Sequence, residues 1–281
     1  MSKATHKHIT SKAIIGTLEQ ITAYGFRMRR IFEDWVRMCE ATLMDLPAHM
    51  AMVQAEGRLL FPEEESAATQ ALWAELADRY GTKWPICANL FRDAFQMLLA
   101  IADREGIHDI LGPIYQEIGS ANSNLGQFFT PWSVCLLMAQ MCDPTPQIHQ
   151  RLKAALTHPD NLLGHALLLA GQLITDPAEI EHFFIEQLIP AALPYYDPIT
   201  VTDPCVGSGA TLLATAATVP AWANAYGLIR YCGQDIDLLC VQMARVQCLL
   251  FGLHGPSEKL VAIDEQASET DAVAQHEALM V

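Results

Sequence analysis

Residues 199–264 alternate short strand-like runs with helical stretches, and this order restricts the fold more than any other feature of the chain. The β-branched run ITVTD (199–203) precedes a glycine loop and a helical run of small residues. The apolar run 228–237 then leads into a helical stretch at 238–253, and KLVAID (259–264) is a third candidate strand. Strands that are joined through helices pair in parallel. The sequence therefore predicts one βαβαβ half of a doubly wound parallel sheet.

A helical N-terminal domain is expected at residues 1–110. Apolar side chains recur at helical spacing through residues 14–46, and we expect Pro47 to end that helix. The same spacing predicts further helices at 67–79 and 85–104. The chain is thus expected to place an all-helical region before the parallel sheet.

The region between the N-terminal helices and the sheet is also expected to be mainly helical. Residues 107–131 predict a helix followed by a loop rich in Gly, Asn and Ser. Thr130 is expected to cap the next helix, with Pro131 at its first position. Residues 144–196 look like an inserted helical hairpin.

The glycine loop and the ends of the first two predicted strands suit a nucleoside-like ligand. Gly207 and Gly209 let the backbone approach a ligand at the carboxyl edge of the sheet. The dinucleotide pattern GxGxxG is not met, because residue 212 is Leu, and Asp203 would repel a pyrophosphate but suit a cationic group. Asp235 is placed to accept hydrogen bonds from ribose hydroxyls, whereas Asp237 is expected to cap the following helix.

Three segments together carry a family resemblance: GQFFTP (126–131), DPCVGSGA (203–210), and GQDID (233–237) with ARVQCLLFGLHG behind it. The residue types in these segments, and the order of the segments, resemble the N6-adenine-specific DNA methyltransferase family. Within that family the resemblance is to the modification subunits of type I restriction–modification systems and to related orphan enzymes. The resemblance covers about residues 107–265. It implies a Rossmann-like, S-adenosylmethionine-dependent methyltransferase sheet preceded by a helical domain. Residues 111–281 would then be a partial methyltransferase domain.

The resemblance also implies a set of cofactor contacts in this chain. The cofactor would be S-adenosylmethionine, and the family reaction is methyl transfer to adenine in DNA. The residues carried over onto matching positions are Gln127, Phe128, Phe129, Thr130, Pro131, Trp132, Asp203, Gly207, Ser208, Gly209, Ala210 and Asp235. Trp132 stands where many relatives have Arg, and Ala210 where Gly is usual.

The family's catalytic tetrapeptide, Asn or Asp followed by Pro-Pro and an aromatic residue, does not occur in the sequence. That motif binds the target amino group and stacks on the flipped adenine. We therefore predict no catalytic residue and no metal site, and we expect a cofactor module that is catalytically incomplete alone. A partner subunit could complete it or supply specificity. The alternative is a non-enzymatic interaction or regulatory protein, such as a pseudo-methyltransferase or an acidic DNA mimic.

The charge of the chain bears on its partners. The formal net charge is −15, which opposes unaided binding to DNA, so DNA binding by this chain alone is expected to be weak. Arg27, Arg29, Arg30 and Arg37 form a basic cluster, either an exposed helix face or a phosphate contact.

The expected location is the cytoplasm. Eight cysteines are scattered without a CxxC pair, as in a reduced protein. The most apolar stretch, 162–174, is too short and too polar to span a bilayer, so no membrane association is expected.

Overall fold

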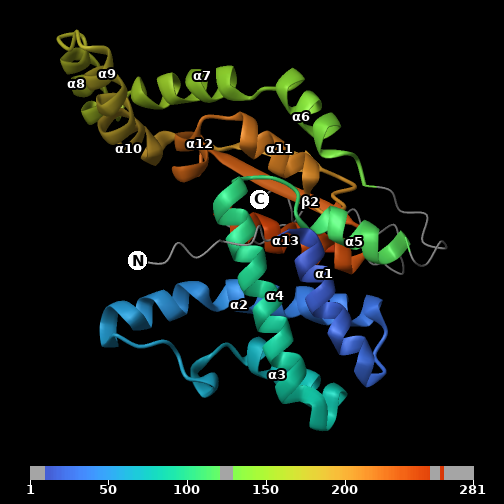
Figure 1. Ribbon diagram of the computed structural model, residues 1–281. Coiled ribbons are helices and arrows are strands. Elements are labelled where there is room, and N and C mark those ends of the chain that lie inside the picture. Colours follow the sequence, from blue (N-terminus) through green and yellow to red (C-terminus); the bar gives the residue numbers. More distant parts are fainter. Residues whose placement is uncertain (1–9, 121–128, 254–259, 263–281) are drawn as a thin grey trace, which may run out of the picture.

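The computed structural model describes residues 10–120, 129–253 and 260–262. The chain is mostly helical and contains a small parallel sheet. Figure 1 shows the helices of the first 105 residues in the lower half of the molecule and those of residues 132–192 in the upper half. In the part that the structure describes, no helix has the length and apolar character that crossing a membrane requires, and no three His, Cys, Asp or Glu side chains are grouped to bind a metal.

The N-terminal region is helical, as predicted. Its elements are α1 (Ser11–Glu19), η1 (Gln20–Tyr24), α2 (Met28–Glu56), η2 (Pro62–Glu64), α3 (Ala67–Tyr80), η3 (Gly81–Lys83), α4 (Trp84–Glu105) and α5 (Leu111–Ser120). The helices expected at 67–79 and 85–104 are therefore confirmed as α3 and α4.

The single helix expected at 14–46 is wrong at two points. The chain breaks at Gly25, which adopts a φ of 92° and ends η1 in the left-handed region that glycine tolerates. The prediction that Pro47 ends the helix is also wrong, because Pro47 lies inside α2. Pro47 is exposed, and α2 continues through it although proline removes the helical hydrogen bond to the carbonyl of Leu43.

Residues 132–195 form the second helical region. Its elements are α6 (Trp132–Met141), α7 (Thr145–Leu156), α8 (Leu162–Gly171), α9 (Pro177–Phe183), the π-helical turn η4 (Phe184–Leu188), α10 (Ile189–Ala192) and η5 (Leu193–Tyr195). The expected capping by Thr130 is wrong: α6 begins at Trp132, Pro131 is its N-cap, and the Pro131 carbonyl accepts from the amides of Val134 and Cys135.

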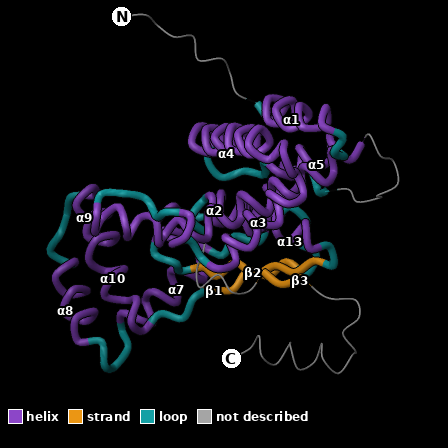
Figure 2. The backbone as a smooth tube through the Cα atoms, turned by 90° about the horizontal axis from the view of Figure 1, so that it is seen from below, coloured by secondary structure: helices purple, strands orange, loops and turns teal. Residues whose placement is uncertain are grey.

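The sheet has three parallel strands in the order β1-β2-β3 (Figure 2). The elements of this region are β1 (Ile199–Asp203), α11 (Ala210–Thr218), α12 (Ala221–Ala225), β2 (Ile229–Asp235), α13 (Leu238–Leu250) and β3 (Leu260–Ala262). The predicted βαβαβ order is therefore confirmed, apart from the extra short helix α12. A wider Rossmann-like sheet stays a prediction.

Helix α13 is shared by two hydrophobic clusters. Its residues Leu239, Cys240, Met243 and Val246 complete the large core that α1–α5 form. Other α13 side chains, Val241, Ala244 and Cys248, pack with Leu212 and Leu213 of α11. Helix α13 thereby joins the sheet to the N-terminal helices. The domain boundary near residue 110 and the hairpin at 144–196 stay predictions.

Candidate functional site

The ends of β1 and β2 meet at one edge of the sheet. Their parallel register pairs Asp203 with Gly233, so the loop that follows β1 lies beside the end of β2. The Gly207 amide donates a hydrogen bond of 2.9 Å to Asp235 Oδ2, and the Asp237 amide donates one of 3.0 Å to Asp235 Oδ1. Asp237 caps α13 by accepting from the Leu239 amide at 2.9 Å, as predicted.

Two glycines allow the loop to fit between its neighbours. Gly207 and Gly209 have φ values of 52° and 93°, in the region that favours glycine. A Cβ at position 207 would lie 3.0 Å from Cδ1 of Phe129, and one at position 209 would lie 3.2 Å from Cα of Ala244. The loop therefore passes between the aromatic residue before α6 and the backbone of α13.

Asp203 is held in place by its own loop and by α11. Its Oδ1 accepts from the Cys205 amide at 2.9 Å, and its Oδ2 accepts from the Thr211 hydroxyl. Thr211 was not among the predicted site residues, although its place in the first turn after the loop is a usable signal. Asp203 also lines a pocket of about 300 Å³ between α6, β1 and α11, with Cys135, Met138, Ala139, Cys142, Val201, Thr202, Pro204, Thr211, Leu212 and Thr215.

A buried polar network fixes the glycine loop from behind. The Ser208 hydroxyl donates to Asp109 Oδ2 at 2.9 Å. The Gln247 side-chain amide donates to Asp109 Oδ1 at 2.9 Å and to the Ser208 carbonyl at 2.7 Å. Gln247 Oε1 accepts from the amides of Ile110 and Leu111, at 2.6 and 3.1 Å. The network thus ties the loop to the start of α5 and to α13.

The sequence interpretation missed both Asp109 and Gln247. Asp109 could have been noticed, because it lies three residues before Gly112 and accepts from the Gly112 amide at 3.0 Å, as a helix cap does. A Cβ on Gly112 would collide with the Asp109 carboxylate and the Ser208 hydroxyl. Gln247 has no such local signal, since its partners lie 39 to 138 residues away.

The predicted aromatic segment reaches this site through Phe129. The Phe129 ring is half-buried, lies against Gly207 and packs on Tyr115 with ring centroids 5.5 Å apart. Thr130 and Pro131 are exposed, and Trp132 packs among α6 and α11 side chains. Gln127 and Phe128 lie outside the described residues.

The structure therefore brings some of the predicted contacts together and separates others. Phe129, Gly207 and Asp235 are adjacent, and Asp203 lies at the same sheet edge. Ser208, Gly209 and Ala210 are buried, so they shape the loop from inside.

A thiol near the two carboxylates is held protonated. Burial, with smaller contributions from the negative charges of Asp237 and Asp235, raises the pKa of Cys240 to about 12. Cys240 therefore carries no thiolate at neutral pH and supplies no nucleophile to this site.

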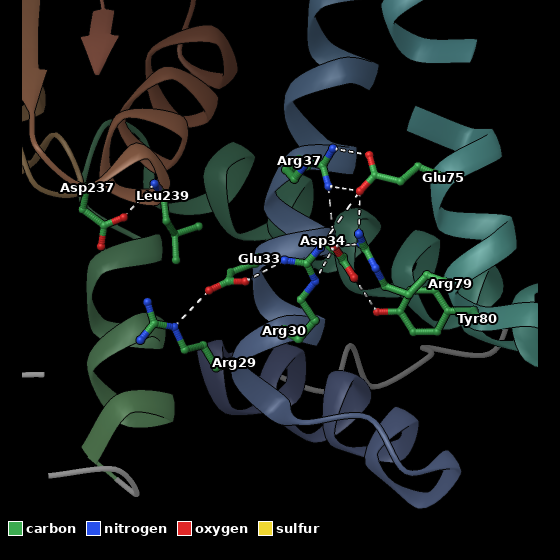
Figure 3. Close-up of polar contacts among 10 residues, drawn as sticks. All are labelled: Arg29, Arg30, Glu33, Asp34, Arg37, Glu75, Arg79, Tyr80, Asp237 and Leu239. Carbon is green, nitrogen blue, oxygen red and sulfur yellow. Dashed lines mark hydrogen bonds and ion pairs between the residues drawn. The ribbon is translucent and has the colours of Figure 1, made fainter. Parts of the chain in front are cut away.

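Three arginines of the basic cluster, Arg29, Arg30 and Arg37, are paired with carboxylates (Figure 3). Arg29 binds Glu33 at 2.9 Å, and Arg37 binds Glu75 of α3 at 2.6 Å. Hydrogen bonding from Arg37, with a further contribution from Arg79, lowers the pKa of Glu75 to about 2. These ion pairs favour the exposed helix face over the phosphate contact.

Beneath these pairs lies the buried carboxylate of Asp34. It accepts hydrogen bonds from Arg79 of α3 and, at 3.0 Å, from the Tyr80 hydroxyl. Burial, reinforced by the negative charge of Asp34, raises the pKa of Tyr80. The phenol therefore stays a donor at neutral pH, and the cluster joins α2 to α3.

Comparison with protein families agrees with the sheet-edge geometry. Residues 169–278 match the family model described as N-6 DNA methylase. This segment is similar to the N-6 DNA methylase family. The match confirms the family recognised from the sequence, and it supports a DNA-methyltransferase-like function. No curated protein and no solved structure shows significant similarity to the chain.

The N-6 DNA methylase segment contains β1, the glycine loop and Asp235, but not every group that shapes the site. Phe129 and Asp109 lie before residue 169. Phe129 contacts the loop from one side and Asp109 bonds to it from behind. The loop therefore depends on residues outside the matched segment.

Proposed function

We propose that this chain binds S-adenosylmethionine at the edge formed by the ends of β1 and β2, and that it serves methyl transfer to the N6 amino group of adenine in DNA. The family match supports the general class of reaction. The cofactor, the base and the residue roles are the proposal. A partner subunit that contributes DNA contacts is part of it, because a net charge of −15 opposes DNA binding by the chain alone.

The observation that carries the proposal is the contact between Asp235 and the Gly207 amide. It places the acidic end of β2 directly against the glycine loop that follows β1. A carboxylate can accept about four hydrogen bonds. Asp235 receives one on each oxygen from the backbone, so both oxygens can still accept from ribose hydroxyls.

The residues at this edge fit S-adenosylmethionine better than a dinucleotide. Asp203 and Asp235 place two carboxylates beside the loop, which attract the cationic amino and sulfonium groups and repel a pyrophosphate. Directly after Asp235, Ile236 and Leu238 are exposed. They offer an apolar surface on the same edge for a purine ring.

In this proposal the protein residues bind and orient the cofactor, and none of them is assigned a proton-transfer step. The bound cofactor would supply an electrophilic methyl group. Asp235 would hold the ribose of the cofactor, and Asp203 would hold its amino group. Phe129 would cover the loop on the side of Gly207, where it excludes water.

Isothermal titration with S-adenosylmethionine tests the proposal. We expect saturable binding to the wild-type protein. Asp235→Ala should weaken it at least about tenfold, because a hydrogen bond to a charged group contributes about 1.5–3 kcal/mol. Asp235→Asn, which keeps one acceptor oxygen, should weaken it less.

Asp160→Ala is the matched control, because the Asp160 side chain is 83% exposed and lies in the turn before α8. It should bind the cofactor as the wild type does. A folded wild-type protein that gives no binding heat would refute the cofactor assignment, and so would an Asp235→Ala variant that binds as tightly as the wild type.

A further inference from the structure

Helix α8 presents an apolar stripe to solvent. The side chains of Leu162, Leu169 and Leu173 are 77%, 66% and 84% exposed, and Ala166 between them is exposed as well. These positions are separated by four, three and four residues. That spacing places Leu162, Ala166 and Leu169 on one face of α8, in the pattern that a helix uses to pack against another helix, and Leu173 follows in the turn directly after α8.

The opposite face of α8 is fixed to the protein. Asn161 caps the helix by accepting from the Gly164 amide at 2.8 Å, and its own amide group donates to the carbonyls of Ala155 and Ala191, both at 2.9 Å. Leu167 and Leu168 pack against the cluster that contains α7, α10 and β1. The exposed stripe is therefore the free face of an anchored helix.

The surroundings of the stripe are acidic. No Lys or Arg occurs in residues 154–229. The same stretch up to residue 196 contains five carboxylates, all exposed: Asp160, Asp176, Glu179, Glu181 and Glu186. Phe183 of α9 lies against Gly171 at the end of α8, so the acidic helix α9 packs next to α8.

Figures 1 and 2 show α8 and α9 together at one end of the molecule, away from α1 and α5. The stripe is thus accessible without displacing the sheet or the glycine loop. A partner that docks there would leave the candidate cofactor site open.

We propose that α8 and its acidic border bind an amphipathic helix of a partner protein, one whose apolar stripe is flanked by Lys and Arg. The helical spacing selects a helix as the occupant, and the charge of the border selects a basic one. A second copy would bring the same carboxylates against each other. DNA and anionic membranes carry the same sign of charge as the border.

Fluorescence anisotropy with synthetic helices tests this surface. The probe is a labelled peptide of about 20 residues, long enough to form a helix, with Leu at heptad spacing and Lys at the flanking positions. A second peptide carries Glu in place of Lys. We expect the Lys peptide to bind at least about tenfold more tightly than the Glu peptide, and its affinity to fall as salt is raised.

Variants locate the binding. Leu169→Ser combined with Leu173→Ser should weaken the binding of the Lys peptide at least about tenfold, because side chains at the centre of an interface dominate its binding energy. Leu59→Ser changes a similarly exposed leucine outside α8, and this variant should bind the Lys peptide as tightly as the wild type does. Unchanged circular dichroism would show that all variants are folded.

Three results would overturn the proposal. The first is that the two peptides bind equally tightly, or that neither peptide binds. The second is sedimentation that shows dimers which the double leucine variant abolishes, because the occupant is then a second copy. The third is binding to phosphatidylcholine vesicles that depends on the same leucines, because the occupant is then a lipid surface. S-adenosylmethionine titration of the double variant should match the wild type, which separates this proposal from the cofactor site.

Discussion

Replacing Gln247 by Leu removes the centre of the buried network behind the glycine loop. Gln247 is fully buried and its side chain makes four hydrogen bonds: two from the amides of Ile110 and Leu111, one to Asp109 and one to the Ser208 carbonyl. Leucine has a similar size but no polar group. The four partner groups would lose these bonds in a place that water does not reach.

The cost can be worked from those four groups. Each buried polar group left unsatisfied costs about 1–3 kcal/mol. The Asp109 carboxylate keeps its bonds from Ser208 and Gly112, so the loss falls mainly on the two amides and the carbonyl. We expect Gln247→Leu to lower the free energy of unfolding by about 3–9 kcal/mol, a large part of the about 5–15 kcal/mol that a folded protein has.

Urea denaturation followed by circular dichroism measures this change. Gln187→Leu is the matched control, because Gln187 is exposed in η4, and it should shift the free energy of unfolding by no more than about 0.5 kcal/mol. A loss below about 1 kcal/mol for Gln247→Leu, with an unchanged dependence on urea, would show that the network does not hold the loop as described.

Three further predictions concern the α2–α3 cluster and the thiols. Asp34→Ala leaves Arg79 without its buried carboxylate and should cost about 3–5 kcal/mol of unfolding free energy, measured in urea; a loss under about 1 kcal/mol would contradict the burial of this pair. The two arginines at Glu75 lower its pKa to about 2, below the ordinary value of 4.5, so its contribution is complete above pH 4.5 and disappears as the pH falls toward 2. Glu75→Gln should therefore lower stability by up to about 1 kcal/mol at pH 7, since the side chain is partly exposed, and by almost nothing near pH 2; equal losses at both pH values would refute the ion pair. Finally, Cys142 and Cys205 are exposed and should react with a thiol reagent at pH 8 well before the buried cysteines, which mass spectrometry of the labelled protein would verify; slow labelling of both would count against their exposure.

Local sequence patterns predicted the elements of the sheet region well. The β-branched run at 199–203, the loop glycines and the cap Asp237 each act within a few residues, so a short window of sequence contains the cause. The neighbouring positions of the glycine loop and Asp235 followed from parallel pairing, which brings the carboxyl ends of strands to one edge.

Patterns of the same kind failed where the rest of the fold decides the outcome. Pro47 lies inside α2, where proline removes one helical hydrogen bond, and no spacing of apolar residues reveals that the helix continues past it. Gln247 is polar and sits in an apolar helix, yet it is fully buried, because its partners come from the start of α5 and from the glycine loop. Such a residue becomes visible only when the segments that it joins are placed together.

The position of α13 has a consequence for synthesis on the ribosome. The core of the N-terminal helices, which begins with Ile14, includes side chains of α13 as far as Val246. Helices α1–α5 therefore leave the ribosome long before α13, which completes their core, has been made. Contacts of such long separation in sequence form slowly, and exposed apolar surface invites aggregation in the interval. We expect the N-terminal helices to need protection by a chaperone until about residue 250 has emerged.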